Sequence, residues 1–404
     1  MANEEADLLT LWLVSYQWVA TVIQALISFG LGVVVARYLG VDQFGVYAIA
    51  TSAGFFITIL LDGGFTTLLQ RESARASLEP SISKQTLSRY SLGYTCLAIA
   101  ILLLIALVNP FNQNTNTLIS IIFAFSPVVL IGQTMSVLRG HGRLARDAIL
   151  QVMNRVSTAF FVIFFVLCGL NSPQSVLFAQ GIGGFILYFI LAFRSKIMPL
   201  FFMPSNLFRV TLPIVAWAIS YALYLKSDLL LCRIFDIPQS NVGSYGIACR
   251  LIESLQVFAG PFGIILFRKF RISDLSREVL IQSVLRLTYT ALAIGVIISS
   301  GAFIFSPTII PWVFGIEYES AVTLFEILSI GLIFFLSNTV LFQAFIVFEL
   351  QRILMIFTAF AGIFSILMNS LLLPMYGVEA CAWTSVLTQF LLSLVMIFTL
   401  AKSK

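Results

Sequence analysis

The chain has 404 residues, of which 59% are hydrophobic and only 10% are charged, and its formal net charge is +5. Because soluble domains carry about 25% charged residues, this composition excludes an ordinary soluble protein. It predicts a protein that crosses the membrane many times as α-helices, since a helix satisfies its own backbone hydrogen bonds in lipid.

Twelve apolar stretches approach or exceed the roughly 20 residues that a helix needs to cross the hydrocarbon core. In chain order, the predicted spans are 11–36, 43–69, 86–108, 117–138, 148–169, 174–194, 208–231, 242–267, 281–304, 320–348, 353–373 and 377–400. The segment after the sixth span contains Pro199 and Pro204 and is typical of a linker. We therefore predict an all-α integral membrane protein with two six-helix lobes, residues 1–198 and 199–404, related by a pseudo-two-fold axis along the membrane normal.

A short internal repeat supports this division. Arg37 follows the first predicted span and precedes Val46–Ala50, and Arg233 follows the seventh span and precedes Ser244–Ala248. Both short segments contain the pattern Tyr-x-Ile-Ala and open the next span. Because each half has an even number of spans, both halves would have the same orientation in the membrane.

Lysine and arginine residues alternate between the loops. Seventeen of the 23 lie in every second loop or at the C-terminus, whereas the intervening loops contain only Arg37 and Arg233. The seventeen are Arg71, Arg75, Lys84, Arg89, Arg139, Arg143, Arg146, Arg194, Lys196, Arg209, Arg268, Lys269, Arg271, Arg277, Arg352, Lys402 and Lys404. By the positive-inside rule, their side is cytoplasmic, so we expect both termini in the cytoplasm. No basic residue precedes the first apolar run, so we expect that run to be a retained span rather than a cleaved signal peptide.

The sequence has few features of an enzyme. It has no phosphate-binding loop, and its single histidine, His141, lies among arginines in a short predicted loop. The five cysteines have no paired spacing, so we interpret them as packing residues rather than disulfides or metal ligands. No nucleophile with a neighbouring base is evident. We predict no metal, no cofactor and no nucleic acid partner, and we expect a transporter rather than an enzyme.

Four cations remain inside the predicted spans once the loops are counted: Arg155, Lys226, Arg250 and Arg286. The acidic residues inside spans are Asp62, Asp228, Glu253 and Glu326. A charge in mid-membrane costs from about 2.5 to more than 10 kcal/mol, so it usually faces a partner or a water-filled cavity. We therefore take the four cations as candidates for a cationic binding cavity, and Asp62, Asp228 and Glu253 as candidates for ion coupling or ion pairing.

Structural alternatives exist for several of these residues. Arg250 and Glu253 are three positions apart on one helix and could form an ion pair. Arg286 lies close enough to the inner interface to extend its side chain to it. Asp228 could meet another helix or the outer water, and Asp62 could cap or pair.

The residues around Arg37 carry a family resemblance. The motifs are Ala36–Tyr47 with Leu61–Phe65; Asp228 with Val242–Tyr245 and Arg250; Gly315–Tyr318 with Ala321; and Pro374–Ala382. In order and spacing they resemble the polysaccharide transporters of the multidrug/oligosaccharidyl-lipid/polysaccharide exporter superfamily, especially the Wzx-type O-antigen flippases. One mild departure is Ala380, where such proteins often have glycine.

The motif residues also suggest local structure. We expect Gly40 and Gly45 to bracket a tight turn, and Gly63 and Gly64 to allow a kink or a close helix approach. We expect Arg37 to anchor the end of its span in the lipid headgroups.

The resemblance implies a function in a bacterial inner membrane. Such a flippase would carry an undecaprenyl-pyrophosphate-linked oligosaccharide, such as an O-antigen repeat unit of lipopolysaccharide, from the cytoplasmic to the periplasmic leaflet by alternating access. Arginine and lysine side chains suit a pyrophosphate, because they form charge-assisted hydrogen bonds with it. Five aromatic residues could stack on sugar rings: Trp18, Tyr94, Tyr221, Tyr224 and Tyr245. Besides the bilayer, possible partners are a polysaccharide polymerase and the chain-length machinery.

Three rivals fit the sequence less well, and the first of them is kept as the alternative. A cation-coupled multidrug antiporter of the same superfamily would favour acidic residues in an apolar N-terminal cavity. A lipid II flippase would be a longer chain with two additional spans. A membrane-bound glycan polymerase would be expected to have a large outer loop with catalytic residues. The sugar composition, the coupling ion, the oligomeric state and the charges that face the cavity are not determined by the sequence.

Overall fold

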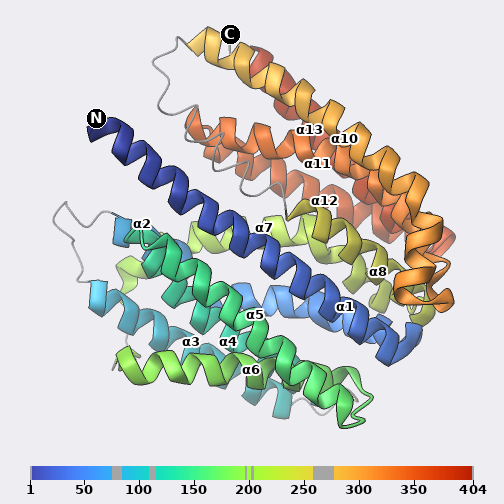
Figure 1. Ribbon diagram of the computed structural model, residues 1–404, viewed down its shortest axis with the longest axis horizontal. Coiled ribbons are helices and arrows are strands. Elements are labelled where there is room, and N and C mark those ends of the chain that lie inside the picture. Colours follow the sequence, from blue (N-terminus) through green and yellow to red (C-terminus); the bar gives the residue numbers. More distant parts are fainter. Residues whose placement is uncertain are drawn as a thin grey trace. The chain divides into compact units, whose positions relative to one another are not determined.

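The computed structural model describes residues 2–74, 84–108, 115–195, 198–201, 204–257 and 277–402, and these residues are helical apart from short connections (Figure 1). The helices are α1 (Ala2–Asp62), α2 (Phe65–Ala74), α3 (Lys84–Val108), α4 (Thr115–Gly140), α5 (Leu144–Leu167), α6 (Pro173–Ser195), α7 (Ser205–Ile234), α8 (Gln239–Gln256), α10 (Arg277–Phe314), the 3₁₀ turn η1 (Ile316–Tyr318), α11 (Ala321–Val347), α12 (Gln351–Tyr376) and α13 (Val378–Lys402).

Glycines divide the N-terminal helices. Gly40 has φ 71° and ψ 170°, so α1 consists of two helical arms rather than one continuous helix. The expected turn between Gly40 and Gly45 is therefore only partly correct, because Gly45 lies inside the second arm. Gly63 and Gly64 have φ values of 55° and 79°, which end α1 at Asp62. The predicted second span, 43–69, is thus too long at its end, whereas the predicted kink at these glycines is confirmed.

Ten helices in the described part of the chain are long and apolar enough to span a membrane, with both arms of α1 included in one of them. This confirms an all-helical protein with many membrane spans. The predicted count of twelve and the pseudo-two-fold axis remain predictions. The predicted span 242–267 lies partly outside the described residues, and α8, which covers its first part, does not qualify as a candidate span.

Contacts divide the chain into two compact units. Unit 1 contains Met1–Tyr38 and Ala50–Ile219, and unit 2 contains Leu39–Ile49 and Ser220–Lys404. The short first section of unit 2 covers the last residue of the first arm of α1 and the start of the second. The predicted lobe boundary between residues 198 and 199 remains a prediction.

Within unit 1, α4 is the central helix and packs against α2, α3, α5 and α6. It is 61% buried over its most apolar window, compared with 6% for α5. Glycines on α6 permit close contact, because a β-carbon on Gly181 or Gly184 would collide with Phe123 or Pro127 of α4. Because α5 is so little buried, its exposed apolar side chains are the ones left to face lipid.

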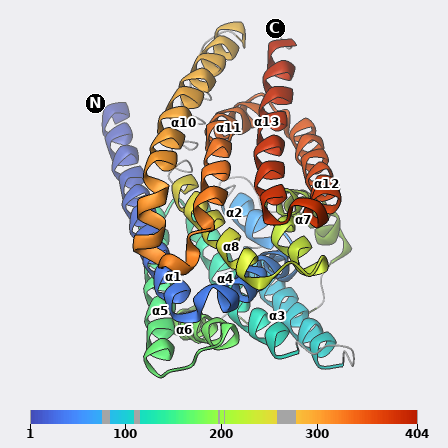
Figure 2. The ribbon, with the colours of Figure 1, turned by 90° about the vertical axis from the view of Figure 1, so that its right-hand side faces the viewer.

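Within unit 2, α10, α11 and α13 lie side by side, and α12 packs along α13 (Figure 2). A buried apolar cluster joins them, with Val284 from α10, Leu341 and Phe345 from α11, and Met396 from α13 all at 0% exposure. Because these side chains are apolar, the cluster contributes packing rather than a binding site.

Candidate functional site

Lys226 on α7 has a partner on the neighbouring helix. Its ammonium group forms a salt bridge with the carboxylate of Glu253 on α8. The ion pair considered from the sequence, Arg250 with Glu253 on one helix face, is therefore replaced by a pair between two helices. Because the two charges compensate, Lys226 contributes little free positive charge to unit 2.

Asp228, two residues further along α7, is also held by α8. Its carboxylate accepts a hydrogen bond from the hydroxyl of Tyr245 and one of 2.8 Å from the backbone N–H of Leu229. This confirms the expectation that Asp228 could meet another helix. Tyr245 itself is fully buried, so it is a packing residue and its ring is not available to stack on a sugar.

Arg250 is held by aromatic rings instead of a carboxylate. Its guanidinium carbon lies 5.9 Å from the ring centroid of Phe44 and 5.2 Å from that of Tyr47, both on the second arm of α1. One guanidinium nitrogen donates a hydrogen bond of 3.4 Å to the Tyr47 hydroxyl. In the part of the chain that the structure describes, Arg250 forms no salt bridge. Aromatic faces attract a cation but leave its charge uncompensated, so Arg250 can still bind an anion.

Glycines bring α8 this close to α1. A β-carbon on Gly45 would collide with the backbone carbonyl of Gln239, and one on Gly243 would collide with the carbonyl of Val41. In the internal repeat, Gly45 corresponds to Gly243 and Val41 to Gln239, so the two contacts are reciprocal. Gly246 meets Ala48, which is its own counterpart in the repeat. The repeated segments thus pack against each other with local two-fold symmetry.

The aromatic contact continues beyond Arg250. Phe44 packs edge-on against Tyr318 in η1, with ring centroids 6.1 Å apart. Burial raises the pKa of the Tyr318 hydroxyl, and the nearby charges of Glu317 and Asp42 raise it further. Tyr318 therefore stays neutral and acts as a packing residue.

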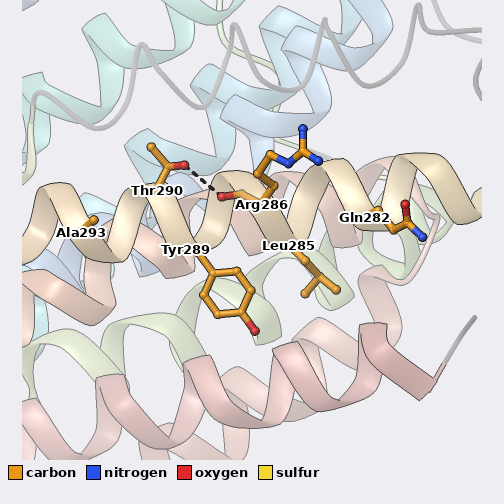
Figure 3. A pocket seen from close by; sticks show the side chains of 6 residues that line it. All are labelled: Gln282, Leu285, Arg286, Tyr289, Thr290 and Ala293. Carbon is orange, nitrogen blue, oxygen red and sulfur yellow. Dashed lines mark hydrogen bonds between the residues drawn. The ribbon is translucent and has the colours of Figure 1, made fainter.

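Arg286 lies on α10 and is exposed. It lines a hollow of about 620 Å³ with Gln282, Leu285, Tyr289, Thr290 and Ala293. Gln282, Arg286 and Thr290 are four residues apart and form one polar stripe along the helix. Figure 3 shows the guanidinium of Arg286 pointing away from the ring of Tyr289, and the hydroxyl of Thr290 donating a 3.0 Å hydrogen bond to the backbone carbonyl of Arg286. Among the described residues, no salt bridge includes Arg286.

Arg155 lies on α5 in unit 1 and is exposed. The structure thus gathers Lys226, Arg250, Asp228 and Glu253 in one cluster of unit 2, whereas Arg286 lies on α10 of the same unit and Arg155 belongs to unit 1. That the four cations share one cavity stays a prediction.

The remaining acidic residues of the spans already accept hydrogen bonds. Asp62 accepts bonds of 3.1 and 3.3 Å from the backbone N–H of Thr66, and another from its hydroxyl, so it caps α2 as one of the two alternatives expected. Glu326 on α11 accepts a bond of 2.9 Å from the Ser306 hydroxyl.

Asp147 is the charged residue that sequence reasoning missed. It is fully buried at the start of α5, and its Oδ2 accepts bonds from Arg139 (2.9 Å), Gln17 (3.0 Å) and Gln151 (2.7 Å). The one signal in the sequence was Gln151, four positions along the same helix. Arg139 was counted only as a label of the cytoplasmic side.

No group of three His, Cys, Asp or Glu side chains in the described ranges is placed to hold a metal ion. Cys232 and Cys381 are buried and in contact, with their sulfur atoms 4.0 Å apart, which agrees with a packing role.

Comparisons with known proteins agree with this fold. A family model described as "Polysaccharide biosynthesis protein" matches residues 13–267. No curated protein sequence matches the chain.

Several solved structures are similar over almost the whole chain. An inward-facing multidrug resistance MATE family transporter of the MOP superfamily has 13% identity and a TM-score of 0.75, covering 96% of this chain and 98% of that chain. The lipid II flippase MurJ, inward closed, has 15% identity and a TM-score of 0.77, covering 95% and 87%. A MOP superfamily transporter from Pyrococcus furiosus Vc1 (DSM3638), for which a reversed polarity of the binding pocket suggests a different function, has 12% identity and a TM-score of 0.65, covering 97% and 95%. At these identities the similarity shows the fold alone.

Proposed function

The chain belongs to the polysaccharide biosynthesis protein family, which confirms the resemblance seen in its motifs, and from this premise we propose that it moves a lipid-linked oligosaccharide across the membrane. The substrate we propose is an undecaprenyl-pyrophosphate-linked repeat unit of a surface polysaccharide such as O-antigen. The proposed membrane is the bacterial inner membrane, with both termini in the cytoplasm.

The proposal rests on one observation, namely the sign of the charges that are left without a counter-charge. Five carboxylates on the described helices accept hydrogen bonds from the chain itself: Asp62, Asp147, Asp228, Glu253 and Glu326. Arg250 and Arg286 form no salt bridge in the same part of the chain. A set of helices in which these five carboxylates accept hydrogen bonds while Arg250 and Arg286 form no salt bridge is suited to an anionic ligand.

The chemistry of arginine fits the proposed headgroup. A guanidinium group presents several N–H donors in one plane and can bind two phosphate oxygens together. Arg250 is half-buried against Phe44 and Tyr47, where its bonds to a phosphate would be less weakened by water. The polyprenyl tail is apolar and can stay in the lipid while the headgroup crosses.

A multidrug antiporter is the second candidate, and the structural similarity to MATE transporters favours it. Such a protein binds cationic compounds and would need an available carboxylate. Asp62 is the carboxylate of the N-terminal half closest to this role, yet Thr66 already donates two hydrogen bonds to it. The matched carboxylates therefore support the flippase more than the antiporter.

The test is a flipping assay with the full-length protein in vesicles that contain a fluorescent polyprenyl-pyrophosphate oligosaccharide. We expect protein-dependent flipping, and a reduction of about tenfold or more in Arg250→Ala, because a hydrogen bond to a charged group contributes about 1.5–3 kcal/mol. Arg286→Ala should reduce flipping less, since its side chain is exposed.

Arg233→Ala is the matched control. Arg233 is an exposed arginine at the end of α7 and lies outside the cluster around Arg250, so its removal should leave flipping unchanged. Absence of flipping by the wild-type protein, together with transport of cationic dyes, would contradict the flippase. Normal flipping by both Arg250→Ala and Arg286→Ala would refute the assignment of these residues.

A further inference from the structure

A second hollow lies in unit 1, where the start of α4, the end of α5 and the start of α6 meet. Its volume is about 730 Å³, within the range of roughly 300–1,000 Å³ found for ligand pockets. Its lining includes Asn116 and Phe123 from α4, Phe165 from α5, Ser172 from the connection, and Gln174 and Phe178 from α6. We call it the α4–α6 hollow.

The lining of the α4–α6 hollow contains no charged side chain. In this it differs from the hollow on α10, which contains Arg286. A phosphate or another ion would lose its hydration there without gaining a counter-charge. The ligand that this lining suits is therefore neutral.

Three aromatic side chains, Phe123, Phe165 and Phe178, line the α4–α6 hollow. The rings of Phe123 and Phe178 lie 5.5 Å apart between centroids, at an angle of 48°, so they present two differently tilted faces. The face of an aromatic ring is partly negative and attracts the partly positive hydrogens of C–H groups. A sugar ring has such C–H groups on its faces and hydroxyl groups around its rim.

The polar edge of the hollow consists of amides and hydroxyls. The Nε2 of Gln174 donates a hydrogen bond of 2.9 Å to the Thr117 hydroxyl, which fixes the amide and leaves its oxygen available. Asn116 is the first polar lining residue of α4, and its amide offers donors as well as an acceptor. Amides suit sugar hydroxyls, because each hydroxyl both donates and accepts a hydrogen bond.

The connection at the edge of the hollow is held in place before any ligand arrives. The backbone N–H of Ser175 donates a 3.1 Å hydrogen bond to the hydroxyl of Ser172. In return, the backbone N–H of Ser172 donates a 3.3 Å hydrogen bond to the hydroxyl of Ser175. The hydroxyl of Tyr38 on α1 donates a hydrogen bond to the Asn171 side chain. An edge that is already ordered loses less entropy when it binds.

We propose that the α4–α6 hollow is a binding site for a neutral sugar ring, a hexose or an N-acetylhexosamine. The ring would lie on Phe123 and Phe178 and form hydrogen bonds with Asn116 and Gln174. The sugar could be free or part of a lipid-linked glycan. That the glycan of the transported lipid uses the hollow rests on the proposed function; that a neutral sugar binds there does not.

The chain offers a reporter next to the hollow. Cys168 is exposed and lies in the turn between two lining residues, Phe165 and Ser172. The full-length protein in nanodiscs, labelled at Cys168 with an environment-sensitive maleimide, would be titrated with N,N′-diacetylchitobiose, lactose and maltose. We expect a saturable fluorescence change with at least one of these sugars, and none with glucuronate at equal concentration. Cys168→Ser, labelled in the same way, should give no change.

Substitutions then locate the site. The double variant Asn116→Leu and Gln174→Leu should weaken the apparent affinity about tenfold, the effect of losing one or two hydrogen bonds. Phe178→Leu, which removes a ring but no hydrogen bond, gives a second measure should the double variant fold poorly. Asn241→Leu is the matched control, because Asn241 is an exposed amide on α8 outside the hollow.

The outcomes separate this proposal from the proposed function. No response to any of the three sugars in the wild-type protein would overturn the site, as would unchanged affinity in both the double variant and Phe178→Leu. Sugar binding without flipping of the labelled lipid would leave the site standing and count against the flippase. Binding of a lipid-linked oligosaccharide in the nanodisc, competed by the free sugar, would identify the glycan as the source.

Discussion

Unit 1 and unit 2 each hold a partly buried arginine, and they compensate its charge differently. In unit 1, Arg139 binds the fully buried carboxylate of Asp147, which two glutamine side chains also contact. In unit 2, Arg250 lies over the rings of Phe44 and Tyr47 and forms no salt bridge within the described residues. The first arrangement neutralises the arginine, whereas the second keeps its charge available.

This difference separates structural from functional charge. A fully buried carboxylate that is bound by an arginine and by neighbouring amides holds helices together and is not accessible to a ligand. A cation on aromatic faces is positioned without losing its attraction for an anion. We therefore expect substitutions in unit 1 to change stability, and substitutions around Arg250 to change transport.

The largest effect should come from breaking the pair in unit 1. Arg139→Ala leaves the Asp147 carboxylate buried without its cation, which should lower the free energy of unfolding by about 3 kcal/mol. A thermal-shift measurement in detergent would report it. Arg146→Ala, which removes an exposed arginine next to Asp147, should have almost no effect. Equal melting temperatures for Arg139→Ala and the wild type would mean that the pair is not structural.

An intermediate effect is expected when Lys226 of unit 2 loses its counter-charge. Glu253→Gln removes the counter-charge of Lys226 and adds one available positive charge beside Arg250. Because Glu253 is 47% exposed, we expect the apparent affinity for the pyrophosphate lipid to rise only about twofold to fivefold. The affinity should also depend more steeply on salt. An unchanged affinity in Glu253→Gln would show that Lys226 takes no part in binding.

The smallest effect should follow loss of the hydroxyl that contacts Arg250. Tyr47→Phe keeps the ring and removes a long hydrogen bond of 3.4 Å, so flipping should change by no more than about twofold. Tyr47→Leu removes the ring as well and should reduce flipping further. If Tyr47→Phe alone abolished flipping, the hydroxyl rather than the ring would position Arg250.

Much of the fold could be predicted from the sequence because lipid imposes a simple rule on composition. Apolar runs such as 117–138 and 353–373 lie within α4 and α12. The ends of helices were harder to predict. Gly63 and Gly64 stop α1 early, while α10 continues through Pro307 and Pro311 to Phe314, beyond the predicted end of 281–304.

The site was predictable only in its residue types. Arg250, Lys226 and Glu253 were identified because a charge in an apolar run is conspicuous. Their partners could not be predicted. Whether Glu253 pairs with Lys226 or with Arg250 depends on how α7 and α8 are rotated against each other. Asp147 was missed for a related reason, because two of its three partners, Gln17 on α1 and Arg139 on α4, lie on other helices.

The reciprocal glycine contact has a consequence for biosynthesis. Residues 39–49 are made early, yet they pack with α8, whose residues are made in the second half of the chain. During synthesis, this segment must therefore wait in the membrane with the backbone of Gly45 uncovered until α8 is inserted. A chain that stops before α8 would expose that surface, and membrane quality control could recognise it as incomplete.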